Sequence, residues 1–190
     1  MIDALRAYDL LIHPGLGNSG VDHWQSHWCM AFPNATRVIQ DEWDDPRRAD
    51  WLARLDAAVA IGTRPAVLIC HSLACALAAH WAARGKTGRV RAIMLVAPAD
   101  VDSPLHTPDC VRDFAPLPLV PLPVPSLVVA SSNDGYIALA RARELAALWG
   151  ADFCDGGELG HINSESRLGL WPQGLVLLGQ LVARIENPAT

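Results

Sequence analysis

Short runs of apolar residues alternate along the chain with longer segments in which apolar residues recur every three or four positions. Several of the short runs are nearly continuous Val, Ile and Leu, as expected for strands that are buried on both faces of a sheet. We predict six such strands, at Tyr8–His13, Thr36–Gln40, Ala66–Cys70, Arg91–Ala97, Ser126–Ser131 and Asp152–Cys154. Strands separated by helices form parallel sheets covered on both faces, so the pattern predicts an α/β fold in three layers.

The longer segments have the ends that helices prefer. We predict four main helices, at about 46–61, Ser72–Arg84, Ile137–Trp149 and Pro172–Ile185. Asp45 is a candidate N-cap of the first helix, and Pro46 suits its first turn. Gly62, Gly85 and Gly150 follow the last turns of the first three helices, where glycine commonly adopts the left-handed conformation.

One segment does not fit the alternation of strands and helices. Eight of the 14 prolines lie between Pro98 and Pro125. Because proline lacks the N–H that helices and sheets require, we predict a long loop without regular structure. The total length of 190 residues predicts one domain, 1–190, with no room for a cap domain. The proline-rich loop follows a central strand, and we expect it to border the functional site in place of a cap.

The composition excludes several classes of protein. The chain has 15 Lys and Arg against 20 Asp and Glu, a net charge of −5, which argues against a nucleic-acid partner. Its apolar runs are shorter than a membrane helix, and its first residues do not resemble a signal peptide. The five cysteines are an odd number and form no C-x-x-C pair, which favours reduced thiols in a cytoplasmic protein.

The strongest chemical signal is a serine at an abrupt change from strand to helix. A serine such as Ser72 on this kind of turn stands above the sheet, with its Oγ exposed and the next backbone N–H directed to the same place. Hydrolases with this turn usually have glycine two positions before and two positions after the serine. Cys70 and Ala74 occupy these positions here. The motif is therefore degenerate, and Ser72 could instead be only a helix N-cap.

Two further strand ends carry residues that fit the same chemistry. Asp134 follows the strand predicted at Ser126–Ser131, and His161 lies in a glycine-rich loop after the last strand. The order Ser, Asp, His along the chain is that of the α/β-hydrolase triad. A serine hydroxyl needs a base to take its proton, a role we assign to His161, and Asp134 would hold the tautomer of that imidazole.

Acyl transfer also needs donors for the oxyanion that forms during attack. We predict that the backbone N–H groups of Leu73 and Leu16 supply them, the second from the loop after the first strand. Asn18 in the same loop is a candidate contact for a small acyl substrate. This chemistry requires no metal or other cofactor.

Taken together, the motifs resemble the small serine-hydrolase family that includes retinoblastoma-binding protein 9 and the YdeN-like proteins, within the α/β-hydrolase superfamily. The matching segments span nearly the whole chain: Pro14–Ser19, His23–Gln25, Ala66–Cys75, Leu95–Pro98, Ser131–Asp134, Gly160–Asn163 and Trp171–Pro172. The resemblance implies a three-layer α/β-hydrolase fold and places nucleophile, acid and base on Ser72, Asp134 and His161. It implies a carboxylesterase-like hydrolase acting on a small ester, thioester or amide.

Two alternative functions stay open. The departures at Cys70 and Ala74 also fit a catalytically weak or inactive protein that uses the same cleft for binding. Gly15–Gly20 matches the G-x-G-x-x-G motif of dinucleotide-dependent oxidoreductases, although that hypothesis leaves the serine, aspartate and histidine unexplained. His23 and His27 have a spacing that zinc can use, but no third ligand is evident.

Overall fold

The computed structural model describes residues 2–85 and 87–186. Its centre is a six-stranded sheet with the order β2-β1-β3-β4-β5-β6, in which neighbouring strands are parallel. The strands are β1 (Asp9–His13), β2 (Ala35–Arg37), β3 (Ala66–His71), β4 (Val90–Val96), β5 (Ser126–Ala130) and β6 (Asp152–Asp155). Each strand overlaps one of the six apolar runs from which a strand was predicted.

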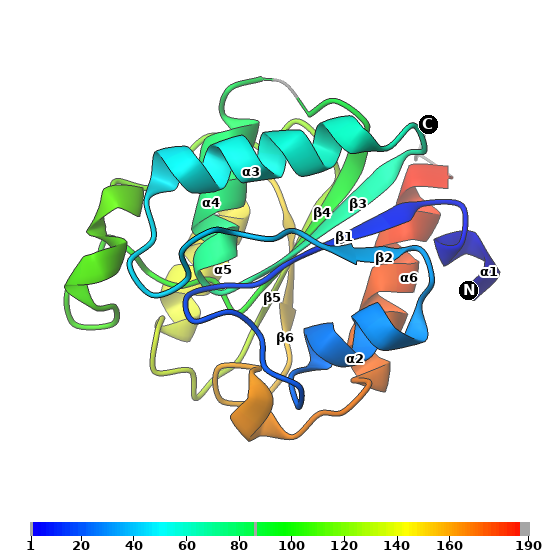
Figure 1. Cartoon of the computed structure of the whole chain (residues 1–190). Coiled ribbons are helices and arrows are strands. Elements are labelled where there is room, and N and C mark those ends of the chain that lie inside the picture. Colours follow the sequence, from blue (N-terminus) through cyan, green and yellow to red (C-terminus); the bar gives the residue numbers. More distant parts are fainter. Residues whose placement is uncertain (1, 86, 187–190) are drawn as a thin grey trace.

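Helices cover both faces of the sheet, which gives three layers (Figure 1). One face carries α3 (Arg48–Ile61), α4 (Leu73–Ala82) and α5 (Leu139–Leu148), and the other carries α1 (Ile2–Leu5), α2 (Trp24–Ala31) and α6 (Pro172–Glu186). Two short 3₁₀ helices, η1 (Asp109–Phe114) and η2 (Ser164–Ser166), lie in loops. Within the described residues, no helix has both the length and the apolar character needed to cross a membrane.

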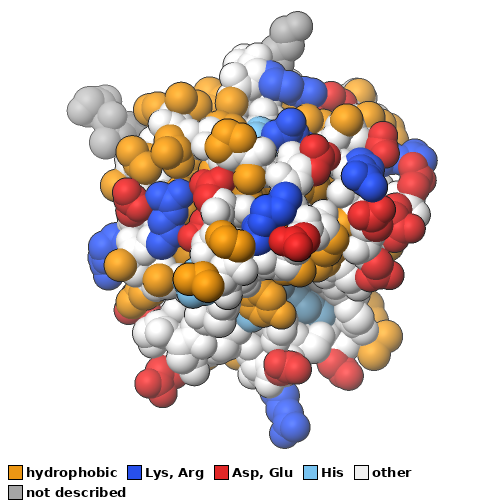
Figure 2. All heavy atoms as spheres, turned by 90° about the vertical axis from the view of Figure 1, so that its left-hand side faces the viewer, with side chains coloured by type: hydrophobic (Ala, Val, Ile, Leu, Met, Phe, Trp, Pro, Cys, Tyr) orange, Lys and Arg blue, Asp and Glu red, His pale blue; other side chains and the backbone are white. Residues whose placement is uncertain are grey.

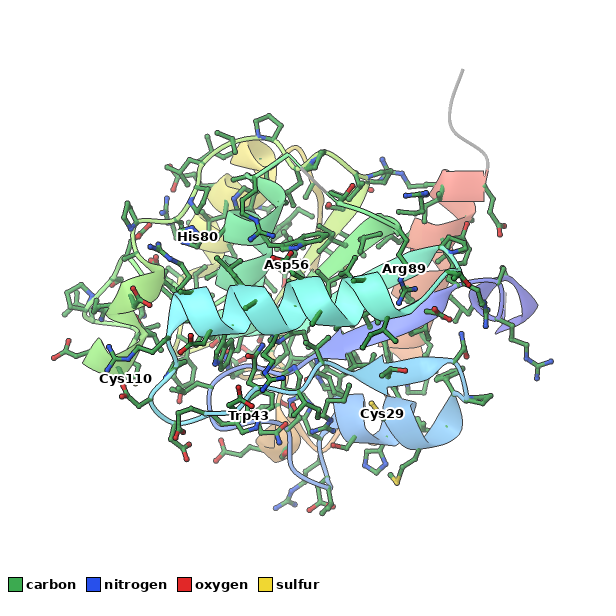
Figure 3. The ribbon with its side chains drawn as sticks, turned by 45° about the horizontal axis from the view of Figure 1, so that its top comes forward. Cys29, Trp43, Asp56, His80, Arg89 and Cys110 are labelled. Carbon is green, nitrogen blue, oxygen red and sulfur yellow. The ribbon has the colours of Figure 1, made fainter. Side chains whose placement is uncertain are left out.

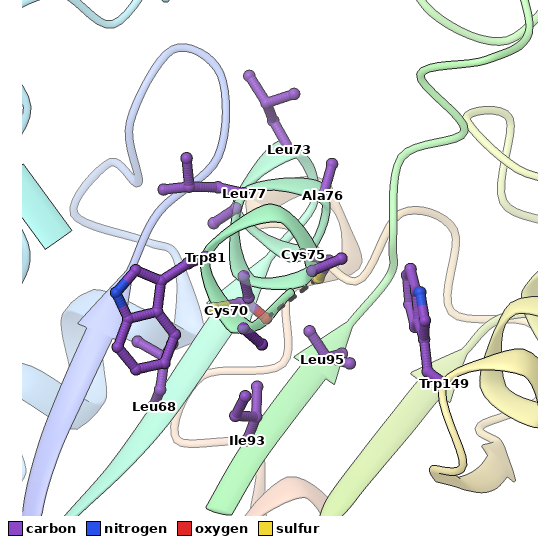
Figure 4. Packing of buried hydrophobic residues seen from close by; sticks show 14 of the residues in the cluster. Leu68, Cys70, Leu73, Cys75, Ala76, Leu77, Trp81, Ile93, Leu95 and Trp149 are labelled. Atoms are coloured by element: carbon purple, nitrogen blue, oxygen red, sulfur yellow. Dashed lines mark hydrogen bonds between the residues drawn. The ribbon is translucent and has the colours of Figure 1, made fainter. Parts of the chain in front are cut away.

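Alternating side chains of each strand divide between two hydrophobic clusters, one on either face. On β3, Leu68 packs with α3, α4 and α5, whereas Val67 and Ile69 pack with α2 and α6. Figure 4 shows the first cluster, in which α4 lies over β3 and β4 with Trp81 on one side and Trp149 on the other. The central strands are therefore held from both sides, and their ends are fixed in space.

The first predicted helix begins later than its sequence suggested, and the prediction of Asp45 as its cap was wrong. The helix α3 starts at Arg48, so Pro46 lies outside it. The acceptor at its N-terminus comes from a distant residue, because the N–H of Arg48 donates to Oδ2 of Asp113 at 2.6 Å. Asp45 instead pairs with the exposed side chain of Arg47.

The three predicted glycine caps differ from one another. Gly85 and Gly150 have φ of +73° and +64°, as predicted for left-handed caps. Gly62 has φ −94° and is not a left-handed cap. Its surroundings give another reason for glycine, because a Cβ there would lie 2.4 Å from the guanidinium of Arg89. Arg89 lies at the end of α3 in Figure 3 and donates from Nε to the carbonyl of Val59 at 2.8 Å.

The proline-rich segment is not wholly irregular, contrary to the prediction. The 3₁₀ helix η1 forms between Pro108 and Pro116, where no proline interrupts the chain. Val111 and Phe114 of this helix are buried in the cluster beneath α4. Nη1 of Arg112 donates to the carbonyl of Val101 at 2.6 Å, which ties the segment to its own start. The segment is thus anchored over the carboxyl ends of the central strands.

Candidate active site

Ser72 occupies a tight turn between β3 and α4. Its backbone has φ 55° and ψ −122°, a conformation that costs a residue other than glycine about 1–3 kcal/mol. Neighbouring elements hold the turn: Ser72 donates its N–H to the carbonyl of Val96 at 3.0 Å, and its own carbonyl accepts from the N–H of Cys75 at 2.9 Å. Cys70 and Ala74 are fully buried on either side, so the turn forms with these small residues in place of glycine.

The structure brings the three predicted catalytic residues together. Nε2 of His161 lies 2.8 Å from Oγ of Ser72, and Nδ1 lies 2.9 Å from each carboxylate oxygen of Asp134. Because a carboxylate only accepts, Nδ1 carries the proton and Nε2 presents its lone pair to the serine hydroxyl. Oδ1 of Asp134 also accepts from the N–H of Tyr136 at 2.9 Å, and the ring of Tyr136 lies 4.3 Å from the imidazole.

The loop that carries the imidazole is fixed by side chains from the end of β5. The N–H of Gly160 donates to Oδ1 of Asn133 at 2.6 Å, and the N–H of Leu159 donates to Oγ of Ser131 at 2.9 Å. The side chains of His71 and Trp24 donate to two backbone carbonyls of the same loop, those of His161 and Ile162. Nε2 of His71 lies 2.9 Å from the carbonyl oxygen of His161, and the indole of Trp24 in α2 donates to the carbonyl of Ile162.

These restraining residues were not predicted from the sequence as part of the site. They are His71, Asn133 and Trp24, and none of them was among the candidate site residues. The indole donor is Nε1 of Trp24, which lies 2.8 Å from the carbonyl of Ile162. The sequence carried one signal for them. His71, Asn133 and Trp24, together with Ser131, lie inside the segments that resemble the hydrolase family.

The loop after β1 lies directly against the serine turn. A Cβ at Gly15 would be 2.7 Å from Cβ of Ser72 and 2.9 Å from the carbonyl oxygen of His71. This close approach places Leu16 at the same cavity as Leu73. Among the described residues, neither backbone N–H has a hydrogen-bond partner. Both N–H groups are therefore available to an oxyanion.

A cavity of about 220 Å³ opens over Ser72. It is lined by Leu16, Asn18, His23, His71, Ser72, Leu73, Ala99, Thr107, Pro108, Val111, Tyr136, His161, Asn163 and Ser164. Four of these, from Ala99 to Val111, belong to the proline-rich segment, which therefore borders the cavity. Figure 2 looks onto this edge of the sheet: histidine side chains show in the lower half of the face, bordered by hydrophobic ones.

Asn18 lies at this cavity, but part of its side chain is occupied. Its Oδ1 accepts from Nη1 of Arg37 and from the N–H of Ser19, both at 2.7 Å. A larger cavity of about 690 Å³ lies between β1, β2 and α3, away from the serine. Two of the charged residues that line it, Arg89 and Asp9, pair with each other at 2.6 Å.

Burial determines the charge of the other polar groups near the serine. It lowers the pKa of His23 to about 4 and that of His71 well below its usual value, so both imidazoles are neutral at pH 7. Burial also raises the pKa of the Cys70 and Cys75 thiols, which disfavours either as a nucleophile. The serine is thus the group best placed to attack.

The structure offers little support for a dinucleotide at the glycine motif or for a zinc ion at the two histidines. Glycine is not needed for packing at Gly20, since a Cβ there would meet nothing within 4 Å. The dinucleotide motif also needs an acidic residue after the second strand to bind the ribose, and Asp41, which occupies that place, is paired with Arg54. Nδ1 of His23 accepts from the N–H of Gln25 at 3.2 Å as the N-cap of α2. Among the described residues, no group of three or more His, Cys, Asp or Glu is arranged to hold a metal ion.

Comparisons with known proteins identify the family of the chain. A family model described as serine hydrolase matches residues 10–180. The chain belongs to the serine hydrolase family. A solved structure of a YdeN-like hydrolase from Pectobacterium atrosepticum is 33% identical, with a TM-score of 0.86 over 97% of this chain and 95% of the other. No curated protein matches the chain significantly.

More distant structures share the fold. The ydeN gene product of B. subtilis is 17% identical, with a TM-score of 0.72 over 93% of this chain and 99% of the other. Est1E from Butyrivibrio proteoclasticus is 12% identical, with a TM-score of 0.68 over 96% and 91%. The fold of this serine hydrolase is therefore the α/β-hydrolase fold, as the resemblance implied.

Proposed function

We propose that this serine hydrolase is carboxylesterase-like and cleaves a small ester, thioester or amide through an acyl-enzyme on Ser72. The observation that carries the proposal is the continuous chain of contacts from the Ser72 hydroxyl to Nε2 of His161, at 2.8 Å, and from Nδ1 to Asp134, at 2.9 Å. Membership of the family gives the reaction class, and this geometry supports the roles that we propose for the three residues.

The mechanism follows from the positions of these atoms. Oγ of Ser72 attacks the substrate carbonyl while Nε2 of His161 takes the hydroxyl proton. Asp134 stabilises the imidazolium that forms. The carbonyl oxygen becomes an oxyanion that accepts from the N–H groups of Leu16 and Leu73. The imidazolium then gives its proton to the leaving group as the bond to it breaks, which leaves the acyl group on Ser72.

A water molecule completes the cycle. His161 takes a proton from the water as its oxygen attacks the acyl carbon, and returns the proton to Oγ of Ser72 when the ester bond breaks. The products are a carboxylic acid and the free enzyme. The cavity of about 220 Å³ supports a small substrate. Leu16, Leu73 and Val111 form an apolar part of its wall, which favours a short acyl chain.

Covalent labelling and turnover test the proposal together. A fluorophosphonate probe should label the wild-type protein and the control Ser132→Ala, whose serine is exposed and close in sequence to the acid, but not Ser72→Ala. On a panel of aryl esters of increasing acyl length, Ser72→Ala should lower kcat on the order of 10⁶-fold, because the triad acts as a unit. Asp134→Asn should lower it about 10⁴-fold.

Two outcomes of these experiments would contradict the proposed function. A wild-type protein that neither reacts with the probe nor hydrolyses any ester of the panel would support an inactive binding protein instead. Labelling that persists in Ser72→Ala would assign the nucleophile to another residue.

The five cysteines at 29, 70, 75, 110 and 154 are free thiols, which supports our expectation that the enzyme acts in a reducing compartment such as the cytoplasm.

A further inference from the structure

One hydrogen bond links the nucleophile's turn directly to the residue that carries the base. Nε2 of His71 lies 2.9 Å from the backbone carbonyl oxygen of His161. A carbonyl only accepts, so Nε2 of His71 carries the hydrogen and donates it. His71 immediately precedes Ser72, and only 5% of its surface is exposed. Its position is therefore fixed by β3 and the serine turn.

The loop of the base needs such a restraint. Residues Gly156, Gly157 and Gly160 give this loop more backbone freedom than most sequences have. Among the described residues, no donor other than His71 reaches the carbonyl of His161. A misplacement of about 1 Å in a reacting group can cost on the order of 10²-fold in rate. Asn133 and Trp24 hold the residues on either side of His161, and His71 holds the carbonyl of His161 itself, so this bond contributes directly to the 2.8 Å contact between Nε2 of His161 and Ser72.

The charge of His71 also bears on the base. The two rings lie 5.0 Å apart, and the ring of His23 lies 4.7 Å from His71 on another side. During the reaction His161 becomes an imidazolium. A second positive charge at this distance would oppose its formation, whereas a neutral ring does not. Burial, and the neighbouring imidazoles of His161 and His23, keep the pKa of His71 well below its usual value.

We propose that His71 is a positioning residue, whose Nε2–H holds the backbone of His161 so that the imidazole stays in line between Ser72 and Asp134. The inference rests on the proposed function, since it concerns the same triad. It assigns to the residue before the nucleophile a role in catalysis that does not require contact with the substrate.

Two amide substitutions separate positioning from mere packing. The side-chain nitrogen of glutamine can reach the place of Nε2, whereas that of asparagine reaches only the place of Nδ1. His71→Asn should therefore lower kcat by about 10- to 100-fold with KM within about twofold, and His71→Gln should keep kcat within about threefold of wild type. Circular dichroism and thermal melting establish that each preparation is folded before rates are compared.

Nuclear magnetic resonance gives a readout that does not depend on turnover. The proton on Nδ1 of His161, shared with Asp134, should give a slowly exchanging downfield signal in wild type and His71→Gln. In His71→Asn this signal should broaden or exchange faster. In the wild-type protein, ¹⁵N spectra should show His71 as the neutral Nε2–H tautomer between pH 5.5 and 8.

Several results would overturn the inference. Equal loss of kcat in both folded variants, or no loss in either, would show that the donor is not what matters. An Nδ1–H or protonated His71 in the wild-type protein would contradict the hydrogen bond itself. If the wild-type protein hydrolyses nothing and Ser72→Ala behaves identically, the proposed function fails, and an unchanged His161 signal in His71→Asn then separately refutes the positioning role.

Discussion

Replacing Gly15 by alanine would force apart the two walls of the site that we propose to bind the oxyanion. The added methyl carbon would lie 2.7 Å from Cβ of Ser72 and 3.2 Å from the backbone nitrogen of Leu73, whereas ordinary contact begins at 3.4 Å. The loop after β1 would have to retreat by about 0.7 Å, because the opposing atoms belong to a turn that β3 and α4 hold in place. Leu16 would move with it.

The size of the effect follows from that displacement. Loss of one oxyanion donor typically costs about 10²–10³ in kcat, and overpacking costs about 1–3 kcal/mol of stability. At about 2–4 °C per kcal/mol for a chain of this size, Gly15→Ala should melt about 2–12 °C below wild type. We therefore expect a folded protein with kcat lowered about 10²–10³-fold.

The assay compares Gly15→Ala with Gly20→Ala. A Cβ at Gly20 meets nothing within 4 Å, so this control should match wild type in melting temperature and in ester hydrolysis. Rates are measured well below the melting temperature of the less stable variant. Wild-type kcat in Gly15→Ala would refute the reasoning, as would an equal loss of activity in Gly20→Ala, which would point to the glycine motif as a whole.

Three further predictions concern the rest of the molecule. Burial lowers the pKa of His13 to about 4, whereas in the unfolded chain it is about 6.5. Between pH 4 and pH 6.5 the unfolded chain therefore binds more protons, and the free energy of unfolding should fall by about 2 kcal/mol from pH 7 to pH 5 because of His13. Urea midpoints at the two pH values check this, and an unchanged pH slope in His13→Asn would contradict it. Leu77→Ala, at a fully buried position, should cost about 2–5 kcal/mol, whereas Leu105→Ala, at a position 92% exposed, should change the urea midpoint little. Iodoacetamide at pH 7.5 should leave Cys70 and Cys75 unmodified until urea is added, because burial raises the pKa of both thiols; mass spectrometry that finds either one modified in the native protein would contradict this.

The sheet could be predicted from the sequence because a strand that is buried on both faces consists almost entirely of apolar residues. Ala66–Cys70 is continuously apolar, and all five of these residues are fully buried in β3. The places of Ser72, Asp134 and His161 could be predicted for a related reason. In a parallel sheet, the residues that follow successive strands meet at one edge, so their order along the chain translates into proximity.

What the sequence did not predict depends on residues far apart along the chain. The N-terminus of α3 is capped by Asp113, 65 positions from its donor, so the nearby Asp45 was a misleading signal. The contacts of His71 with His161 and of Trp24 with Ile162 span 90 and 138 positions. Local patterns indicate which residue types suit a loop, but they do not indicate which side chain reaches its carbonyls.

The positive φ of Ser72 affects which substitutions selection for stability favours at this position. A glycine at this position would relieve the backbone penalty of about 1–3 kcal/mol, and a single substitution of this kind is among the larger stabilising changes a chain can gain. Selection for stability alone would therefore favour loss of the serine. If Ser72 is the nucleophile, as we propose, a screen for thermostable variants of this hydrolase should include activity as a criterion from its first round.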